Sequence, residues 1–272
     1  MLARREIPPE YQEWNHRWGA PLGRHRPAVG AVSRLGPSVR KLMRHDPRAV
    51  RARGPFAFQW NTSTRAVEYP WAYHQLAPLG PSRVLEIGGA LSGLQFVLAK
   101  EGFEVHNVDP FVDYGSGDYG IAPEREHAEL NRAFGTDVVL HRTTLPEAGL
   151  RGGFSAVYCI STIEHLSPED VDATLRTARE LLVPGGILVV TVDLFLNLEP
   201  FCSRTSNRWG VNMSLARIEE ILGGPLLAGE RAELCGYEEF STDRILSRLE
   251  EFAVGAGYPQ LAQLATFGTP GG

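Results

Sequence analysis

The most informative segment of this 272-residue chain is Val84-Leu85-Glu86-Ile87-Gly88-Gly89-Ala90-Leu91-Ser92-Gly93. An apolar run ends in a cluster of small residues, and apolar positions at helical spacing (Leu94, Val97, Leu98) follow at once. This order predicts a strand, a tight turn and a helix. Glycine in such a turn reaches positive φ and lets a ligand approach the backbone. The helix that opens there presents N–H groups suited to an electron-rich or anionic ligand, so we expect a ligand at this turn.

A second strand is expected over residues 103–108, and Asp109 follows it directly. An acidic residue at the tip of the second strand is where a doubly wound nucleotide-binding fold holds a ribose by its hydroxyls. The pattern Gly88-x-Ala90-x-x-Gly93 also fits an imperfect dinucleotide fingerprint. The turn and Asp109 alone therefore leave the type of nucleotide cofactor open.

Two later segments narrow the choice. Residues 154–166 are expected to form a buried strand that runs into a loop containing Glu164-His165-Leu166. Residues 181–193 contain Pro184-Gly185-Gly186 before an apolar run ending in Asp193. In this order and spacing, the segments resemble the class I S-adenosylmethionine-dependent methyltransferases, over about residues 80–195. Ala90 and Ser92 stand where that family usually has its second and third glycines. We expect the turn to avoid positive φ at both.

The alternation of strands and helices predicts an α/β fold with a parallel sheet covered on both faces. The resemblance implies a doubly wound, mostly parallel, seven-stranded Rossmann-like methyltransferase sheet. We expect a basic, aromatic-rich N-terminal arm or lid over residues 1–75. Residues 76–272 would form the S-adenosylmethionine-binding catalytic domain, with an acceptor-binding insertion at about 194–214.

The resemblance also implies which residues bind S-adenosylmethionine. Glu86 corresponds to an acidic position that orients the methionine ammonium directly or indirectly, and Asp109 would take both ribose hydroxyls. The family often has an acidic residue that reaches the adenine, and none stands here, so a threonine or a backbone group would serve. The full expected set is Glu86, Gly88, Gly89, Ala90, Asp109, Pro110, Thr144, Ile160 and Ser161.

His165 and Asp193 are the candidate catalytic residues. A histidine near its ordinary pKa accepts a proton at neutral pH. In the resembled family the histidine of the Glu-His-Leu run faces the acceptor in several members and only fixes the loop in others, so both roles stay open. Asp193 would contact the acceptor or support His165. These two residues could also hold a divalent metal, but with no third ligand we predict no metal site. His127 and His141 carry no spacing signal and are expected at the surface.

The charge is uneven along the chain. Residues 1–54 carry twelve Arg or Lys and four acidic residues, a balance of +8, and the whole chain stands at −5, which leaves −13 for the remainder. A basic arm suits an anionic substrate, nucleic acid or an acidic carrier, but a solvated helical arm folded over the acidic body is favoured. A short basic helix is expected over residues 38–50, broken by Gly54-Pro55. The aromatic segment 56–73 either lids the cofactor or packs between arm and body.

No apolar run approaches transmembrane length, and the three cysteines are far apart without a C-x-x-C pair. We expect a cytoplasmic enzyme that transfers a methyl group to a small-molecule acceptor, by O-methylation in bacterial specialised or sugar metabolism. Nucleic acid and membrane partners are not expected, and a homodimer is left open. The alternatives are a nicotinamide-dependent oxidoreductase, a non-methylating cofactor-binding protein on the same fold, and a partner protein whose basic arm docks an acidic carrier. Glu86 and Pro184-Gly185-Gly186 argue against the oxidoreductase.

Overall fold

The computed structural model describes residues 9–18, 45–59, 65–111, 123–192, 206–207, 210–211 and 220–221. The helices are α1 (Pro9–Trp18), α4 (Pro47–Arg53), α5 (Arg65–Leu76), α6 (Gly93–Lys100), α7 (Pro123–Phe134) and α8 (Pro168–Leu181), with the short 3₁₀ turns η1 (Ala77–Leu79) and η2 (Ile163–His165). The strands are β1 (Arg83–Ile87), β2 (Glu104–Val108), β3 (Val139–His141), β4 (Phe154–Ile160), β5 (Leu182–Thr191), β6 (Ser206–Asn207) and β7 (Gly210–Val211).

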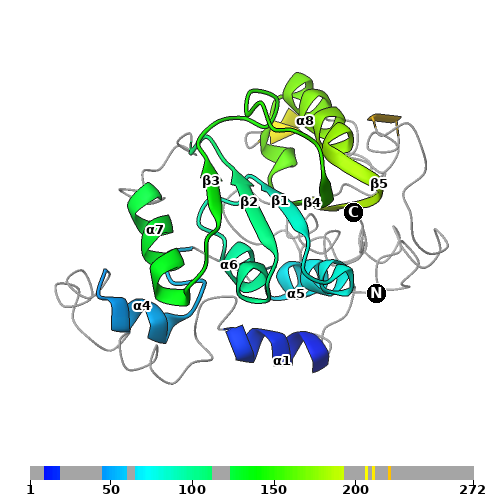
Figure 1. The fold of residues 1–272 in the computed structure, drawn as a ribbon. Helices are drawn as coiled ribbons and strands as arrows, with labels where there is room; N and C mark the ends of the chain where they lie inside the picture. Colours follow the sequence, from blue (N-terminus) through cyan, green and yellow to red (C-terminus); the bar gives the residue numbers. More distant parts are fainter. Residues whose placement is uncertain are drawn as a thin grey trace, which may run out of the picture.

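The main sheet has the order β3-β2-β1-β4-β5, and every neighbouring pair is parallel. The strand order reverses between β1 and β4, as a doubly wound α/β fold requires. The predicted mostly parallel sheet is therefore confirmed for five strands (Figure 1). β6 and β7 form a separate antiparallel pair. The last strand expected from the sequence, over residues 260–267, lies outside the described residues.

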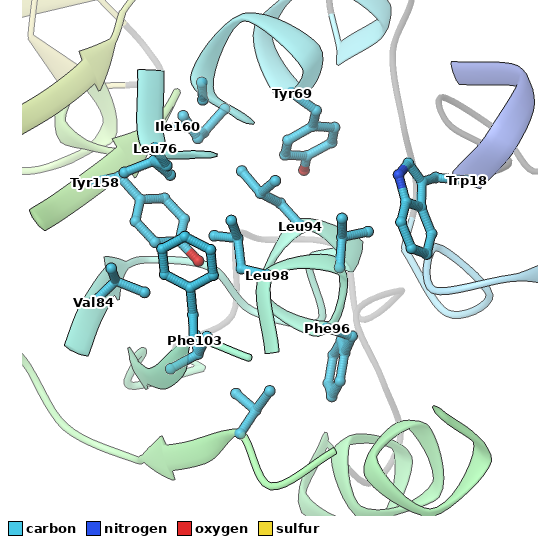
Figure 2. Packing of buried hydrophobic residues seen from close by; sticks show 14 of the residues in the cluster. Trp18, Tyr69, Leu76, Val84, Leu94, Phe96, Leu98, Phe103, Tyr158 and Ile160 are labelled. Carbon is cyan, nitrogen blue, oxygen red and sulfur yellow. The ribbon is translucent and has the colours of Figure 1, made fainter. Parts of the chain in front are cut away.

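The two faces of the sheet carry separate clusters of buried side chains, because successive residues of a strand point to opposite faces. Val84 of β1 packs in a cluster with residues of α1, α5 and α6, whereas the next residue, Leu85, packs with residues of α8. In Figure 1, α8 lies on one side of the sheet, and α5, α6 and α7 lie on the other. Figure 2 shows the first cluster, in which the side chain of Trp18 from α1 lies near those of α6.

The N-terminal segment contributes to this core. Tyr11, Trp14 and Trp18 of α1 are buried, and so is Val50 of α4. α4 lies against α7, where His45 contacts Glu129 at 2.8 Å and Arg51 Nε donates to the carbonyl of Ala133 at 3.0 Å. The described parts of the N-terminal segment thus pack against the helices on this side of the sheet. Its buried aromatic residues show that this segment is not simply a solvated helix.

Only the last part of the basic helix expected over residues 38–50 lies within the described residues. Asp46 accepts hydrogen bonds from the N–H groups of Arg48 and Ala49, so the described helix begins at Pro47 rather than earlier. It continues to Arg53 and ends at Gly54, whose φ is 86°. The predicted break at Gly54-Pro55 is confirmed, and residues 38–44 lie outside the described residues.

The transition from α8 to β5 also differs from the prediction. Ser167 caps α8 by accepting from the N–H of Asp170 at 3.1 Å, as expected, but the helix ends at Leu181 and pairing with β4 starts at Leu182. The register then jumps, since Phe154 pairs with Leu182 and Ala156 pairs with Ile187. Pro184-Gly185-Gly186 therefore forms a bulge within β5 instead of a separate turn before it.

The helices that the structure describes include none that is both long and apolar enough to cross a membrane.

Candidate functional site

Three non-glycine residues of the described chain have a left-handed backbone: Ala90 (φ 43°), Phe111 (φ 50°) and Ser161 (φ 46°). They follow β1, β2 and β4, which are adjacent in the sheet, so all three lie at the carboxyl edge of the strands. This conformation costs a residue with a Cβ about 1–2 kcal/mol, and such strain gathers at functional sites. Ligands of open α/β sheets bind at this same edge. We therefore take this edge as the candidate site.

Ala90 contradicts the expectation that the turn avoids positive φ there. Its N–H donates to Asp109 Oδ2 at 2.7 Å, and its carbonyl accepts from Asn107 Nδ2 at 2.9 Å and Gln95 Nε2 at 3.3 Å. These three bonds hold the left-handed conformation against its steric cost. Ser92 meets the expectation, because its φ is −53° and its hydroxyl caps α6 by accepting from the N–H of Leu94.

Glycine is required at positions 88 and 89 because side chains of the protein occupy the space that a Cβ would need. A Cβ on Gly88 would lie 2.1 Å from Cγ2 of Thr162, and a Cβ on Gly89 would lie 2.5 Å from the carboxyl carbon of Glu86. Neither contact is sterically possible. The turn thus packs directly on β1 and on the loop after β4.

Glu86 lies beneath this turn and is only 1% exposed. Tyr158 Oη donates to Glu86 Oε2 at 3.3 Å. Burial raises the pKa of Glu86 to about 8, although hydrogen bonds from Ser92 and Tyr158 act to lower it. The carboxyl group is therefore largely protonated at neutral pH. Of the two roles expected for Glu86, this position fits the indirect one.

Asp109 is 2% exposed and is fixed from two sides. Its Oδ2 accepts from the N–H of Ala90 and its Oδ1 accepts from the N–H of Phe111, both at 2.7 Å. Burial raises the pKa of Asp109, whereas these two bonds and nearby Arg142 act to lower it. Each carboxylate oxygen can accept more than one hydrogen bond, so acceptor capacity remains for two ligand hydroxyls. Pro110, the next residue, is partly buried.

The N-terminus of α6 is closed, contrary to the expectation that its N–H groups would receive a ligand. The N–H of Gly93 donates to Gln59 Oε1 at 3.2 Å, and that of Leu94 donates to Ser92 Oγ at 3.2 Å. The ring of Phe56 covers Gly93 so closely that a Cβ there would lie 2.5 Å from it. Phe56 and Gln59 were not predicted individually. The density of aromatic residues in segment 56–73 was the signal that this segment packs against the turn.

On the loop after β4, the structure places Ser161 and His165 at the carboxyl edge. The N–H of Ser161 donates to the carbonyl of Thr191 at 2.9 Å and to its hydroxyl at 3.1 Å. His165 is partly exposed and ends η2, where its N–H donates to the carbonyl of Thr162 at 3.0 Å. Ile160, the last residue of β4, is buried. Asp193, the predicted partner of His165, lies outside the described residues.

Thr144 lies just beyond β3 and is exposed. Its hydroxyl donates to Glu147 Oε2 at 2.8 Å, within the turn that follows the strand. Thr144 therefore follows the carboxyl end of β3 by three residues. The expected contact with the adenine stays a prediction.

Of the two histidines expected at the surface, His127 is buried and His141 is partly exposed. His127 is 4% exposed, contacts the ring of Phe96 and lies 3.3 Å from Gln95 Oε1, and burial lowers its pKa to about 4. His141 is partly buried and its Nε2 lies 2.9 Å from Nδ1 of His106. The burial of His127 could have been predicted from the sequence, because His127 lies three residues before the apolar Leu130 and therefore on the same face of the helix.

The described residues include no group of three His, Cys, Asp or Glu side chains placed to hold a metal ion.

A family model described as a methyltransferase domain matches residues 45–223, more than half of the chain. The chain belongs to this methyltransferase family. The resemblance to class I S-adenosylmethionine-dependent methyltransferases is thereby confirmed, and S-adenosylmethionine is the cofactor. The acceptor capacity left on Asp109 fits the ribose of that cofactor. The nicotinamide-dependent alternative is not favoured.

Several solved structures are similar to part of this chain. One is the 1,6-didemethyltoxoflavin-N1-methyltransferase of Burkholderia thailandensis, at 17% identity over 75% of this chain and 82% of that chain, with a TM-score of 0.49. The N-methyltransferase NodS of Bradyrhizobium japonicum is 16% identical over 62% of this chain and 78% of that chain (TM-score 0.46). The PH0226 protein of Pyrococcus horikoshii is 19% identical over 60% and 84%, respectively (TM-score 0.43). No curated protein matches the chain.

Proposed function

We propose that this methyltransferase transfers the methyl group of S-adenosylmethionine to a hydroxyl group of a small molecule. The observation that carries the proposal is the position of His165, a partly exposed residue in η2, the short turn that follows the carboxyl end of β4. An alcohol or phenol must lose a proton when it is methylated, and histidine is the side chain suited to take it near neutral pH.

The cofactor supplies a methyl group already activated on a sulfonium, so the protein has only to bind, align and deprotonate. Asp109 would accept hydrogen bonds from both ribose hydroxyls through the capacity left on its two oxygens. The backbone of Gly88, Gly89 and Ala90 would lie along the methionine and ribose parts, with Glu86 supporting the turn from below. Pro110, Thr144, Ile160 and Ser161 would border the adenine and the sulfonium.

The closed N-terminus of α6 supports this cofactor over a dinucleotide. A Rossmann dinucleotide fold places the pyrophosphate on the free N–H groups at the start of this helix. Here the N–H of Gly93 is bonded to Gln59 and its Cα is covered by Phe56. A pyrophosphate would have to displace both side chains, whereas a ribose bound by Asp109 would not.

His165 is assigned as the base, with Asp193 orienting or supporting it. The rival role for His165 is a clamp that fixes the loop after β4 through hydrogen bonds. Residues 1–75 would close over the acceptor, and the insertion at about 194–214 would complete its pocket. We further propose that the enzyme works in the cytoplasm, in bacterial specialised or sugar metabolism.

Isothermal titration calorimetry with S-adenosylhomocysteine and with NAD tests the cofactor site. We expect binding of S-adenosylhomocysteine only, and an Asp109→Ala variant whose affinity falls by about 1–3 kcal/mol, the usual effect of leaving buried hydroxyl partners unmatched. Unchanged affinity would remove Asp109 from the site. Tight NAD binding without S-adenosylhomocysteine binding would contradict the whole proposal.

A second comparison tests the base. With a panel of phenols and sugars as acceptors, His165→Ala should lower kcat by roughly 10²–10⁴-fold and leave the affinity for S-adenosylhomocysteine unchanged. His165→Gln keeps hydrogen bonding but takes no proton. If Gln restores the activity that Ala loses, His165 is a clamp; if both variants are inactive and wild-type kcat rises through one ionisation near neutral pH, it is the base.

A further inference from the structure

A buried carboxylate from the N-terminal segment reaches the candidate site. Glu68 of α5 is 4% exposed, and its side chain lies where β4 and β5 end. Its Oε1 accepts hydrogen bonds from the hydroxyl of Ser161 and, at 3.0 Å, from the hydroxyl of Thr191. Its Oε2 accepts from Arg65 Nη1 at 2.7 Å. Glu68 is not among the residues expected from the sequence to form the site.

This arrangement is costly unless every partner is in place. A carboxylate that is removed from water loses several kcal/mol of solvation free energy. Only a close opposite charge and hydrogen bonds offset this loss. Arg65 supplies the charge. Burial acts to lower the pKa of Arg65, but the negative charge of Glu68 and its neighbours raises it, so the guanidinium stays charged. Because buried pairs seldom add net stability, the pair is better explained by the geometry it imposes.

The Arg65–Glu68 pair fixes the conformation of the loop after β4. Ser161 has a left-handed φ of 46°, and it is held by Thr191 through its N–H and by Glu68 through its hydroxyl. The next residue, Thr162, donates its hydroxyl to the carbonyl of Gly88 at 3.2 Å and packs where a Cβ of Gly88 would be. A continuous chain of contacts therefore runs from α5 through Ser161 and Thr162 to the glycine turn.

We propose that Glu68 is a positioning residue for methyl transfer. By fixing Ser161, it sets the position of Thr162 against the turn at Gly88, and so couples helix α5 to the edge that binds the cofactor. The inference rests on the proposed placement of the cofactor at this edge. It does not depend on whether the acceptor is an oxygen or a nitrogen.

The test measures S-adenosylhomocysteine affinity by calorimetry and the free energy of unfolding in urea on the same variants of the full chain. Glu68→Ala should weaken binding by about 5- to 150-fold, the usual range for coupling between two parts of a protein. The matched control is Glu101→Ala. Glu101 accepts from Tyr73 at 2.8 Å and so holds the same helix at a point away from the carboxyl edge. The Glu101→Ala variant should have a lower free energy of unfolding than wild type, and its dissociation constant for S-adenosylhomocysteine should change by less than about twofold.

A double variant separates positioning from folding, also where Glu68→Ala does not fold. Arg65→Leu with Glu68→Leu removes both partners of the pair together, which should recover part of the free energy of unfolding that Glu68→Ala loses, because Arg65 is no longer left without Glu68. Affinity for S-adenosylhomocysteine should stay low in this variant. Wild-type affinity in the double variant would overturn the proposal. If Asp109→Ala also leaves binding unchanged, the placement of the cofactor fails; if Asp109→Ala weakens binding, only the role of Glu68 fails.

Discussion

Ala90 keeps a left-handed backbone although glycine would adopt it without steric cost. Ala90→Gly should relieve about 1–2 kcal/mol of strain and lose roughly 0.5–1 kcal/mol through the greater freedom of the unfolded chain. We expect a net gain of about 0–1.5 kcal/mol in the free energy of unfolding, measured in urea. The control is Ala173→Gly in the middle of α8, which should lose about 1 kcal/mol. Equal losses in both variants would show that Ala90 is unstrained.

Glu86 should make stability depend on pH. Its pKa is about 8 in the folded protein and near its ordinary 4.5 in the unfolded chain. The folded protein therefore binds this proton more tightly, so the contribution is complete below pH 4.5 and is lost as pH rises through about 8. Glu86→Gln imitates the protonated carboxyl and should not lose it. In urea unfolding from pH 5 to 9, the stability of wild type relative to Glu86→Gln should fall; a constant difference would mean that Glu86 does not titrate there.

Whether a residue of the candidate site could be predicted from the sequence depends on what brings it to the site. Asp109 and Ser161 could be placed from the sequence, because each follows an apolar run that reads as a strand, and parallel strands end at one edge. Glu68 and Gln59 could not, because both lie before β1 and reach the edge only through the packing of the N-terminal segment. Local periodicity holds no information about that packing. The φ of Ala90 was predicted wrongly because its hydrogen-bond partners Gln95, Asn107 and Asp109 come from α6 and from β2 and its end, which the sequence of the turn does not reveal.

At the scale of elements, helix α6 takes its first hydrogen-bond acceptors from outside the helix. Gln59→Ala should lose the bond from the N–H of Gly93 and lower the free energy of unfolding by about 0.5–2 kcal/mol, the usual effect of losing an N-terminal cap. Gln59→Glu keeps an acceptor and adds a charge that suits the helix N-terminus, so it should retain most of this stability. Thermal unfolding of the two variants checks this. A Glu variant no more stable than the Ala variant would contradict the capping role.

The strands were predicted more accurately than their connections. β1, β2 and β4 are apolar runs bounded by glycine, aspartate or serine, and the sequence placed the start of each to within one residue. The start of β5 was missed because Pro184-Gly185-Gly186 reads as a turn by itself. Only the neighbouring β4, which supplies Phe154 as a pairing partner for Leu182, shows that the strand has already begun.

At the scale of the whole molecule, the N-terminal segment is part of the core. Trp14 is 5% exposed, packs edge-on against Phe56 at 6.0 Å between ring centroids, and belongs to the cluster that contains Val84 of the central strand. Trp14→Ala should lower the free energy of unfolding by about 3–5 kcal/mol. Glu13→Ala, an exposed neighbour on the same helix, should change it by less than about 0.5 kcal/mol. Comparable losses in urea unfolding would show that α1 is only a surface arm.

The hydrogen bonds of the glycine turn have a consequence for binding kinetics. Ala90 and Gly93 are bonded to Asp109, Asn107 and Gln59 within the chain alone, so the described part of the turn is organised before a ligand arrives. The backbone of the turn then does not have to become ordered when a ligand binds, and it does not become disordered when the ligand leaves. If the demethylated product binds at this turn as proposed, its residence time would be set by the contacts that must be broken, and turnover would not be slowed by refolding of the turn between cycles.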